Sequence, residues 1–437
     1  MQRNIRSISF NIKHLDTFKD KVALQPADCA CFFNSSAPCK IVLPLSILCL
    51  RTILNSLPSR EAVVPDPDLT KACGYSADLS NVLSNITSKG NLIVRLKPKK
   101  QHEVGRLVAF VELLKESKLG EYFHSIVDIG AGMGHLSRIL SMYITSCSII
   151  AVEGNNDLVE KSVLLDERFR RSYTPYVTPK HHCEYLPSGS RETYIAELYN
   201  SAKTLLIGLH ACGDLSSSIL RLFINSQNVS GVILFGCCYH KLSVANRDQL
   251  VDSNKISGFP LSSTYRMIRF SRSALDLACH GNESFADHLL TKHHCSYIVQ
   301  CYRAVLEYLI ANNGNEEIRC LRSSLAISSV TRSNGLDFEE YVKLALSKYP
   351  EVMNAICSQI ANDNKAKELV SSVDKEWRHL LVVHCLRLLF APLIEHILIR
   401  DRVEFLKEHG HTVFVIPLFD PRISPRNFAI VSFKELR

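Results

Sequence analysis

The fold is decided by the stretch Val127-Asp128-Ile129-Gly130-Ala131-Gly132-Met133-Gly134-His135-Leu136. It contains the end of an expected short apolar strand, 124–128, and the start of an expected helix, 134–143. Glycines at such a turn let the backbone approach a ligand closely, and the start of the helix supplies unpaired N–H groups. The stretch therefore predicts a ligand-binding loop between a strand and a helix.

An acidic residue, Glu153, ends the next expected strand, 147–152. A carboxylate about 20 residues beyond such glycines is suited to accept hydrogen bonds from a ribose diol. The glycines differ from the G-x-G-x-x-G pattern of dinucleotide sites, because the third comes one position early. NAD binding and a glycine-rich turn without a ligand are thus the two less favoured interpretations of the loop.

Apolar strands alternate with helices on both sides of this loop. Further strands are expected over 204–209 and 231–235, and further helices over 155–168 and 214–225. Continuous apolar strands of this kind predict a parallel, doubly wound α/β sheet.

The end of the chain bears on the domain organisation. A long apolar helix is expected from Trp377 toward Gly410, with a kink or restart at Pro392, followed by two strands over 412–418 and 427–433. These strands predict an antiparallel finish to the same sheet. The expected organisation is an N-terminal helical extension (1–90), a core with the first five strands (91–240), a helical insertion (241–375) and the end of the core (376–437).

Composition excludes some classes of protein. Of 437 residues, 46% are hydrophobic and 22% charged, which excludes a disordered chain. The apolar run Ile41–Leu50 is too short to cross a bilayer, so no membrane partner is expected. The net charge of +8 permits an anionic partner such as RNA without requiring one.

The 16 cysteines bear on the cellular location. They are scattered through apolar stretches, and no secretory signal is expected, which favours a reducing intracellular compartment, the cytoplasm or the nucleus. The start of the chain, 1–18, is amphipathic and poor in acids, so a mitochondrial location is the less favoured alternative.

Polar and sulfur-bearing residues follow two of the expected strands. They are His210, Cys212 and Asp214 after the strand 204–209, and Cys237, Cys238 and His240 after the strand 231–235. Because ligands bind outside the carboxyl ends of strands in an open parallel sheet, all six are expected to face the pocket that the glycine loop borders.

Three interpretations of these six residues are open. The favoured one is a substrate pocket in which His210 or His240 acts as a base. The second is a metal site, whose ligand types suit zinc although the spacings match no common zinc module. The third is that the cysteines are small buried apolar residues. No metal ligand is assigned on this basis.

The pattern D-x-G-x-G-x-G with an acid after the second strand resembles the first two motifs of class I S-adenosylmethionine-dependent methyltransferases. The resemblance implies a Rossmann-like, seven-stranded sheet that is parallel except for an antiparallel last strand. It also implies that the loop accommodates the methionine part of S-adenosylmethionine and that the acid holds the ribose. The implied cofactor-binding residues are Asp128, Gly130, Gly132, Gly134 and Glu153.

Several further motifs together resemble the methyltransferase-like protein 25 family, which includes a ribosomal RNA adenine dimethylase domain-containing member. They comprise the glycine loop, Gly208–Leu215, Gly236–Tyr239, Pro98–Val104, Gly258–Ser262, Phe338–Tyr341, Ala391–Glu395 and Phe419–Asn427. The resemblance covers residues 70–437. It implies methyl transfer but does not fix the acceptor.

The resemblance places the six strand-end residues on the acceptor side, as candidate catalytic residues. Lys99, Lys100 and His102 are candidate substrate-binding residues, since the lysines could bring positive charge to a phosphate or to the cofactor's carboxylate. A solvated basic start of the helix is the open alternative for the lysines. RNA is favoured over protein as acceptor, because Cys237-Cys238 is similar to an element of a transfer RNA ribose 2′-O-methyltransferase family. Adenine dimethylation is not expected, because His210-Ala211-Cys212-Gly213 replaces the Asn/Asp-Pro-Pro-aromatic motif. The alternative function is a cofactor-binding or RNA-associated scaffold without catalysis.

Overall fold

The computed structural model describes most of the chain. The described residues are 26–33, 45–57, 96–173, 176–186, 203–245, 257–291, 295–321, 325, 327–328, 330 and 336–435. They fall into two compact units, one made of Met1–Arg51 and Phe285–Leu389 and the other of Thr52–Ser284 and Phe390–Arg437. The predicted amphipathic start, 1–18, lies outside the described residues.

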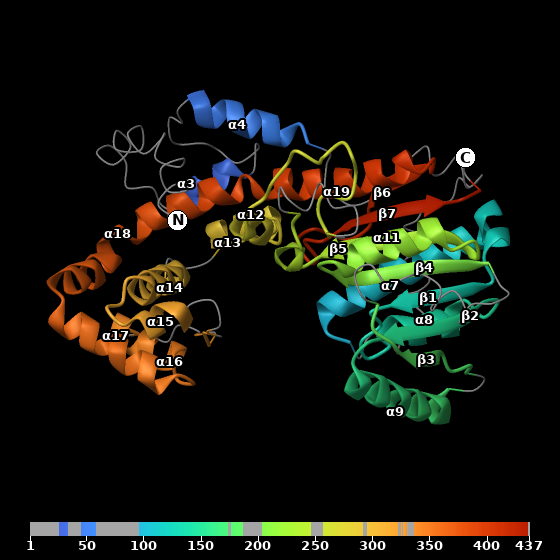
Figure 1. Ribbon diagram of the computed structural model, residues 1–437, viewed down its shortest axis with the longest axis horizontal. Helices are drawn as coiled ribbons and strands as arrows, with labels where there is room; N and C mark the ends of the chain where they lie inside the picture. The colour runs from blue at the N-terminus through green and yellow to red at the C-terminus, as the bar shows by residue number, and fades with distance from the viewer. Residues whose placement is uncertain are drawn as a thin grey trace. The chain divides into compact units, whose positions relative to one another are not determined.

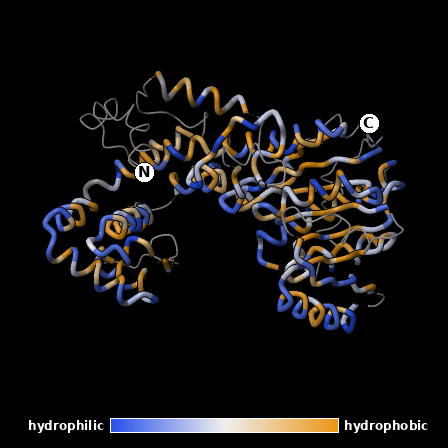
Figure 2. Tube along the Cα trace, viewed as in Figure 1, coloured by the Kyte–Doolittle hydropathy of each residue, from blue (hydrophilic) through white to orange (hydrophobic). Residues whose placement is uncertain are grey.

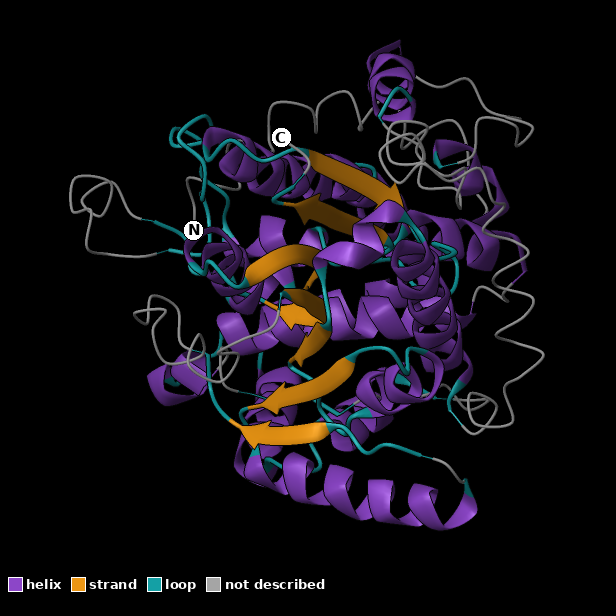
Figure 3. Cartoon of the chain, turned by 90° about the vertical axis from the view of Figure 1, so that its right-hand side faces the viewer, coloured by secondary structure: helices purple, strands orange, loops and turns teal. Residues whose placement is uncertain are grey.

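The second unit holds a seven-stranded sheet (Figures 1 and 3). Its strands are β1 (Ser125–Ile129), β2 (Ser148–Glu153), β3 (Lys180–Cys183), β4 (Thr204–Cys212), β5 (Val229–Cys237), β6 (Val413–Pro417) and β7 (Phe428–Phe433). Their order across the sheet is β3-β2-β1-β4-β5-β7-β6. The pairs among β1 to β5 are parallel, whereas β7 is antiparallel to both of its neighbours. The predicted sheet with an antiparallel last strand is confirmed.

Helices cover both faces of this sheet (Figure 3). They are α7 (Pro98–Glu116), α8 (His135–Tyr143), α9 (Asn156–Ser172), α11 (Leu215–Asn225), α12 (Arg272–Leu277) and α19 (Ala391–Glu408), with short 3-10 helices η3 (Lys118–Tyr122) and η4 (Tyr239–Lys241). Figure 2 shows hydrophilic and hydrophobic residues alternating along α9, as expected for a helix with one face on the protein.

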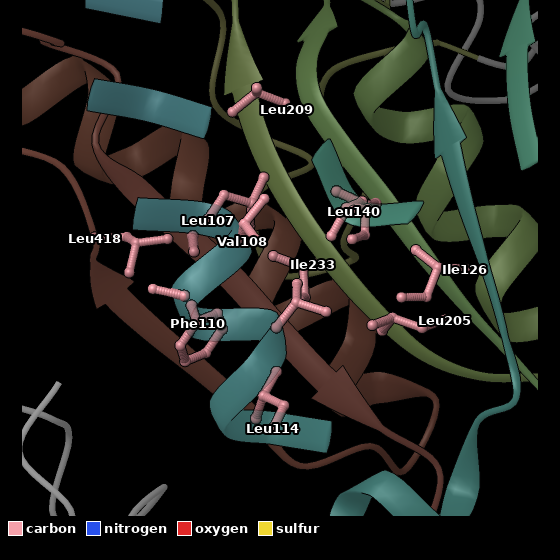
Figure 4. Packing of buried hydrophobic residues seen from close by; sticks show 14 of the residues in the cluster. Leu107, Val108, Phe110, Leu114, Ile126, Leu140, Leu205, Leu209, Ile233 and Leu418 are labelled. Carbon is pink, nitrogen blue, oxygen red and sulfur yellow. The ribbon is translucent and has the colours of Figure 1, made fainter. Parts of the chain in front are cut away.

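One face of the sheet packs against α7 and α8. Side chains alternate along a strand, so Ile126 of β1 points to this face and Val127 to the other. Leu107 and Leu114 of α7 are fully buried in this cluster and lie against the strands in Figure 4. Pro98, at the start of α7, has no N–H to leave unpaired, which suits it to this position.

The other face packs against α11 and α19. Phe223 of α11 and Leu406 of α19 are fully buried there, together with Val127 and Leu206 from the strands. Because both faces are covered, β1 and β4 are buried at nearly every position, which is why their sequences show no strict alternation of apolar and polar residues.

The first unit is helical. Its elements are α3 (Pro26–Cys29), η1 (Ala30–Phe32), α14 (Cys295–Ala311), α15 (Glu316–Leu321), α16 (Phe338–Ala345), α17 (Pro350–Asn362) and α18 (Asn364–Leu388), while α4 (Leu45–Asn55) and α13 (Asn282–Thr291) cross the division between the units. Within the unit, the ring of Tyr302 on α14 lies 5.5 Å from that of Phe338 and 5.7 Å from that of Tyr341 on α16.

This helical unit does not coincide with the predicted insertion, 241–375. Phe259, Leu275 and Ala278 pack with Tyr239 and Leu398 in a cluster of the sheet unit. That packing keeps the segment after β5 with the sheet, and the helical part of the chain extends as far as Leu389.

Two local features differ from expectation or refine it. The strand β3 was not predicted, because Lys180–Cys183 is polar and only four residues long. The long apolar helix predicted from Trp377 restarts rather than kinks, since α18 ends at Leu388 and α19 begins at Ala391 with Pro392 in its first turn.

The same stretch bears on membrane spanning. Among the described residues, Trp377–Glu408 passes a test of length and composition for a membrane-spanning helix, with a mean hydropathy of 1.8 over its most apolar window. The expectation of no membrane partner rested on Ile41–Leu50 and did not include this stretch. Of that window, 44% is buried inside the protein, and core helices of soluble proteins pass the same test, so the evidence for a membrane span is weak.

Candidate active site

The glycine loop joins β1 to α8 with three residues in the left-handed region. Gly130, Gly132 and Gly134 have φ of 75°, 57° and 66°. Any other residue pays roughly 1–2 kcal/mol for this conformation, so the loop requires glycines. Gly130 N–H donates to the carbonyl of Val152 at 2.9 Å, which fixes the loop against the end of β2.

Glu153, at the end of β2, ties the loop to the next helix. Its Oε2 accepts a hydrogen bond from Gly132 N–H at 2.9 Å, and its Oε1 accepts one from Asn155 N–H at 3.0 Å. A carboxylate oxygen has two lone pairs, so each oxygen keeps the capacity to accept a second hydrogen bond from a ligand. The structure thus brings two predicted cofactor-binding residues, Gly132 and Glu153, into contact.

The three glycines differ in what surrounds them. A Cβ on Gly134 would lie 2.2 Å from Ser162 Oγ, and one on Gly130 would lie 3.2 Å from the Leu215 side chain. Among the described residues, none lies within 4 Å of a Cβ on Gly132. Gly132 is therefore the position at which the loop borders open space, while Gly134 is needed for packing.

A buried ionic network of Arg138, Asp166 and His181 contacts the glycine loop. Asp166 of α9 accepts from Arg138 Nε at 2.5 Å, and its other oxygen lies 2.5 Å from His181 Nε2 on β3. Arg138 Nη2 also donates to the carbonyl of Met133 at 3.3 Å, inside the glycine loop. The network therefore links the loop, α8, α9 and β3. His181 has a structural role in this network through its contact with Asp166.

Asp128 lies beneath the loop rather than at its open side. The side chain is buried and accepts a hydrogen bond from Ser137 Oγ at 2.6 Å. Burial raises the pKa of Asp128 to about 6, and the bond from Ser137 and the charges of Lys100 and His210 oppose that rise. Asp128 was predicted to bind the cofactor, but the side-chain contact observed for it is with Ser137, in the first turn of α8.

His135 follows the loop directly, at the start of α8. Burial, with the neighbouring positive charges of Arg138 and Lys100, lowers the pKa of His135 to about 4, so its ring is neutral at pH 7. The charge of Lys100 acts on both His135 and Asp128, which places this predicted substrate-binding lysine beside the glycine loop.

Glu103 of α7 was not predicted as a site residue. It is 2% exposed, accepts from Ser424 Oγ at 2.6 Å and lies 3.2 Å from His210 Nε2. Burial raises the pKa of Glu103, but the hydrogen bonds of His210 and Ser424 outweigh burial and hold it below the ordinary value. Glu103 therefore joins α7, the end of β4 and the loop before β7.

The side chains near Glu103 divide between surface and interior. Lys99, about half exposed, lies 3.8 Å from Glu103. His102 instead accepts a hydrogen bond from Asp420 N–H at 2.9 Å, and its ring packs edge-on against Phe419. Both of these contacts are with the loop before β7. Burial and the charge of Arg106 lower the pKa of His102. Among the candidate substrate-binding residues, the lysines remain accessible and His102 supports the loop.

Three of the candidate catalytic residues converge. Cys212 Sγ lies 3.2 Å from Cys237 Sγ and 3.3 Å from Cys238 Sγ. The thiol of Cys237 lowers the pKa of Cys212 to about 5, against the effect of burial, and the Cys238 thiol and the charge of Lys241 add to this. The hydrogen bond with Cys212 and burial raise the pKa of Cys237, and burial and the same neighbouring thiol raise the pKa of Cys238.

The other candidates are placed elsewhere. Asp214 Oδ1 accepts from Ser243 N–H at 2.8 Å, and a Cβ on Gly258 would lie 1.9 Å from that oxygen. Asp214 thus holds the segment after η4. His240 Nδ1 lies 3.5 Å from Cys279 Sγ, and His210 pairs with Glu103. Among the described residues, neither Asp214 nor His240 belongs to the thiol cluster.

Comparison with known proteins identifies the domain that contains these residues. Residues 99–245 match a family model described as a methyltransferase domain. The chain is 30% identical to probable methyltransferase-like protein 25 of Mus musculus over 239 residues, which is 53% of this chain and 37% of that protein. The resemblance to methyltransferase-like protein 25 is confirmed. The Homo sapiens protein of that name is 29% identical over 260 residues, 57% of this chain and 41% of that protein. The match spans less than half the length of either relative.

Solved structures with some similarity include the plantazolicin methyltransferase BpumL in complex with SAH. That chain is 11% identical, with 71% of this chain and 94% of that one covered, at a TM-score of 0.22. A complex of BpumL with a pentazolic desmethylPZN analog and SAH covers 67% and 84%, at the same TM-score and 10% identity. A TM-score this low carries no argument about this chain.

The matched methyltransferase domain holds most of the site. The glycine loop, Glu153, Glu103 and the three clustered cysteines all lie within 99–245. Ser424 lies outside that range, in the last part of the sheet unit. The methyltransferase domain therefore depends on the end of the chain to complete the hydrogen bonds of Glu103.

Proposed function

We propose that the chain is an S-adenosylmethionine-dependent methyltransferase. The observation that carries the proposal is the contact between Glu153 and Gly132, in which an acid fixes the one loop glycine that borders open space. Backbone without a side chain suits close approach of a ligand, and the acid at the end of β2 suits a ribose. Lys100, whose charge reaches the loop, suits a ligand carboxylate.

The chain's own groups would then bind and orient the reactants. S-adenosylmethionine supplies an activated methyl group on a sulfonium that leaves readily, so positioning is the main task of the protein. The loop and Glu153 would hold the cofactor, and the ends of β4 and β5 would hold the acceptor. His210 is 40% exposed with its Nε2 on the buried Glu103. That pairing orients its ring to accept a proton from an acceptor group through its other nitrogen.

We propose RNA as the acceptor. The support is electrostatic: Lys97 and Lys99 are exposed at the start of α7, next to Glu103 and the end of β4, and the chain has a net charge of +8. Lysines at this place can contact phosphates without reading sequence. A protein acceptor is the competing possibility.

Calorimetry tests the cofactor. The wild-type chain is expected to bind S-adenosylmethionine and S-adenosylhomocysteine, and Gly132→Arg, which fills the open side of the loop, is expected to bind neither. Binding of NAD alone, or unchanged binding in Gly132→Arg, contradicts the proposal.

Transfer of a labelled methyl group tests the reaction and the acceptor. Recombinant protein is incubated with labelled S-adenosylmethionine and extracts separated into RNA, protein and small molecules. Label in RNA that disappears in His210→Ala supports the proposal, whereas label in protein contradicts the RNA assignment. Cofactor binding without label in any fraction supports the scaffold alternative.

A further inference from the structure

The three clustered thiols have a use that methyl transfer does not require. Cys212, Cys237 and Cys238 come from the ends of neighbouring strands, and their sulfurs all lie within 4.8 Å of one another. We propose that they bind one zinc ion through three sulfur ligands, leaving a fourth position for water or a ligand atom.

The spacing of the sulfurs suits a single ion. The two shortest separations are 3.2 Å and 3.3 Å. Tetrahedral zinc with Zn–S bonds of about 2.3 Å separates its sulfurs by about 3.8 Å, so small side-chain rotations admit the ion. A disulfide instead needs two sulfurs about 2.05 Å apart.

The backbone is arranged to bring consecutive cysteines to one point. Along a strand, neighbouring side chains point to opposite faces, so Cys237 and Cys238 would separate if β5 continued. Cys238 instead has φ 48° and ψ 47°. Left-handed backbone in a residue other than glycine costs roughly 1–2 kcal/mol and is found mainly at functional sites. Here it turns Cys238 back toward Cys212.

Neighbouring turns hold this conformation. Gly213 N–H donates to the carbonyl of Cys237 at 3.0 Å, and Lys241 N–H donates to that of Cys238 at 2.9 Å. A Cβ on Gly213 would lie 2.9 Å from the Lys241 carbonyl oxygen, so the two turns pack closely. The three ligands are thus positioned by backbone contacts before any ion binds.

The chemistry and exposure of the ligands favour zinc. Sulfur ligands select soft ions such as zinc and copper(I), and zinc completes a tetrahedron with a fourth ligand. Cys237 is 7% exposed, while Cys212 and Cys238 are of intermediate exposure, so an ion can enter from solvent and be held by a buried ligand. The zinc site lies at the strand ends that are proposed to hold the acceptor, but its test reads metal content and does not depend on methyl transfer.

Metal analysis of the full-length chain, purified without chelator, tests the proposal. One zinc ion per chain is expected in the wild type, and loss of zinc in Cys212→Ser and in Cys238→Ser. Cys183→Ser is the matched control, because Cys183 is an exposed thiol on β3, outside the cluster. Copper in place of zinc, or equal zinc in all four proteins, overturns the proposal.

A second measurement uses only the wild-type chain, so it does not depend on the folding of a variant. Cysteine alkylation is mapped by mass spectrometry with added zinc and after removal of metal by a chelator. Protection of Cys212, Cys237 and Cys238 by zinc, with Cys183 labelled in both samples, supports the site. Equal labelling of the three cysteines in both samples, or a disulfide among them, overturns it.

Discussion

The carboxylate of Glu153 accepts a hydrogen bond from the backbone N–H of Gly132 at 2.9 Å. This bond joins the end of β2 to the one loop glycine with open space around it. The two residues lie on different strand-to-helix connections, so the bond fixes the width of the gap between them. A substitution at Gly132 can therefore affect ligand binding and folding stability to different extents.

Gly132→Ala is expected to weaken binding of S-adenosylmethionine at least tenfold and to cost roughly 1–2 kcal/mol in stability, because alanine is strained at φ 57°. Gly410→Ala is the matched control. Gly410 has φ 80° and a Cβ there would meet nothing within 4 Å, but it follows α19, outside the loop. Calorimetry and thermal unfolding should show similar losses of stability in both variants and a loss of affinity only in Gly132→Ala. Equal affinities would refute the role of Gly132.

Glu153→Gln is expected to weaken S-adenosylmethionine binding by roughly 10- to 100-fold, since a hydrogen bond to a charged group contributes about 1.5–3 kcal/mol. The amide has one acceptor oxygen, yet two backbone N–H groups, of Gly132 and Asn155, point at this side chain. The control is Glu160→Gln on α9, which removes the same charge from an exposed residue that bonds only Asn156 among the contacts described. Calorimetry that finds equal losses in both variants would argue for a general charge effect instead.

Asp166→Asn is expected to destabilise the protein by about 3–5 kcal/mol, because it leaves the buried charge of Arg138 without its carboxylate. Arg138 is 1% exposed and Asp166 3% exposed. Denaturant unfolding measures the loss. Glu404→Gln, which breaks an exposed pair with Lys407 on α19, should cost less than about 1 kcal/mol. A similar small cost for both variants would mean that the network under the loop is not stabilising.

The buried carboxyl group of Asp128 is expected to make the stability of the folded protein depend on pH. Burial raises its pKa from 3.8 to about 6, so the folded state binds the proton more tightly than the unfolded state. The stabilisation is fully present below the unfolded pKa and is lost as the pH rises through about 6, for a total of about 3 kcal/mol. The unfolding free energies of wild type and Asp128→Asn are compared between about pH 4 and pH 7, and the wild type should lose most of this stabilisation relative to the variant. A constant difference across this range would contradict the prediction.

The sheet could be predicted because its signals are local. Apolar strands, glycines and an acid at fixed spacing all lie within short windows, and β1, β2, β4 and β5 appear close to their predicted places. The strand β3 escaped prediction because its four residues are polar and, among the described strands, it pairs only with β2 at the edge of the sheet. Its pairing depends on tertiary contacts such as that of His181 with Asp166, which no local pattern encodes.

The site was predictable only in part, for the same reason. The three cysteines were expected at strand ends and do meet there. Glu103 was missed because its partner Ser424 is 321 positions away in the sequence, and a glutamate in a helix gives no signal by itself. Asp214 and His240 have suitable residue types and positions, but their side chains contact Ser243, after η4, and Cys279, after α12.

The place of β7 between β5 and β6 has a consequence for synthesis of the chain on the ribosome. The edge of β5 pairs with Phe428–Phe433, and the ring of Phe433 would collide with any side chain at Gly231. That edge has no partner until nearly 200 residues after β5, including the helical segment Phe285–Leu389, have been translated. A nascent chain that stalls before β7 therefore exposes an open strand, the form most prone to pairing with another molecule. We expect cells to hold such intermediates on chaperones until the last strand emerges.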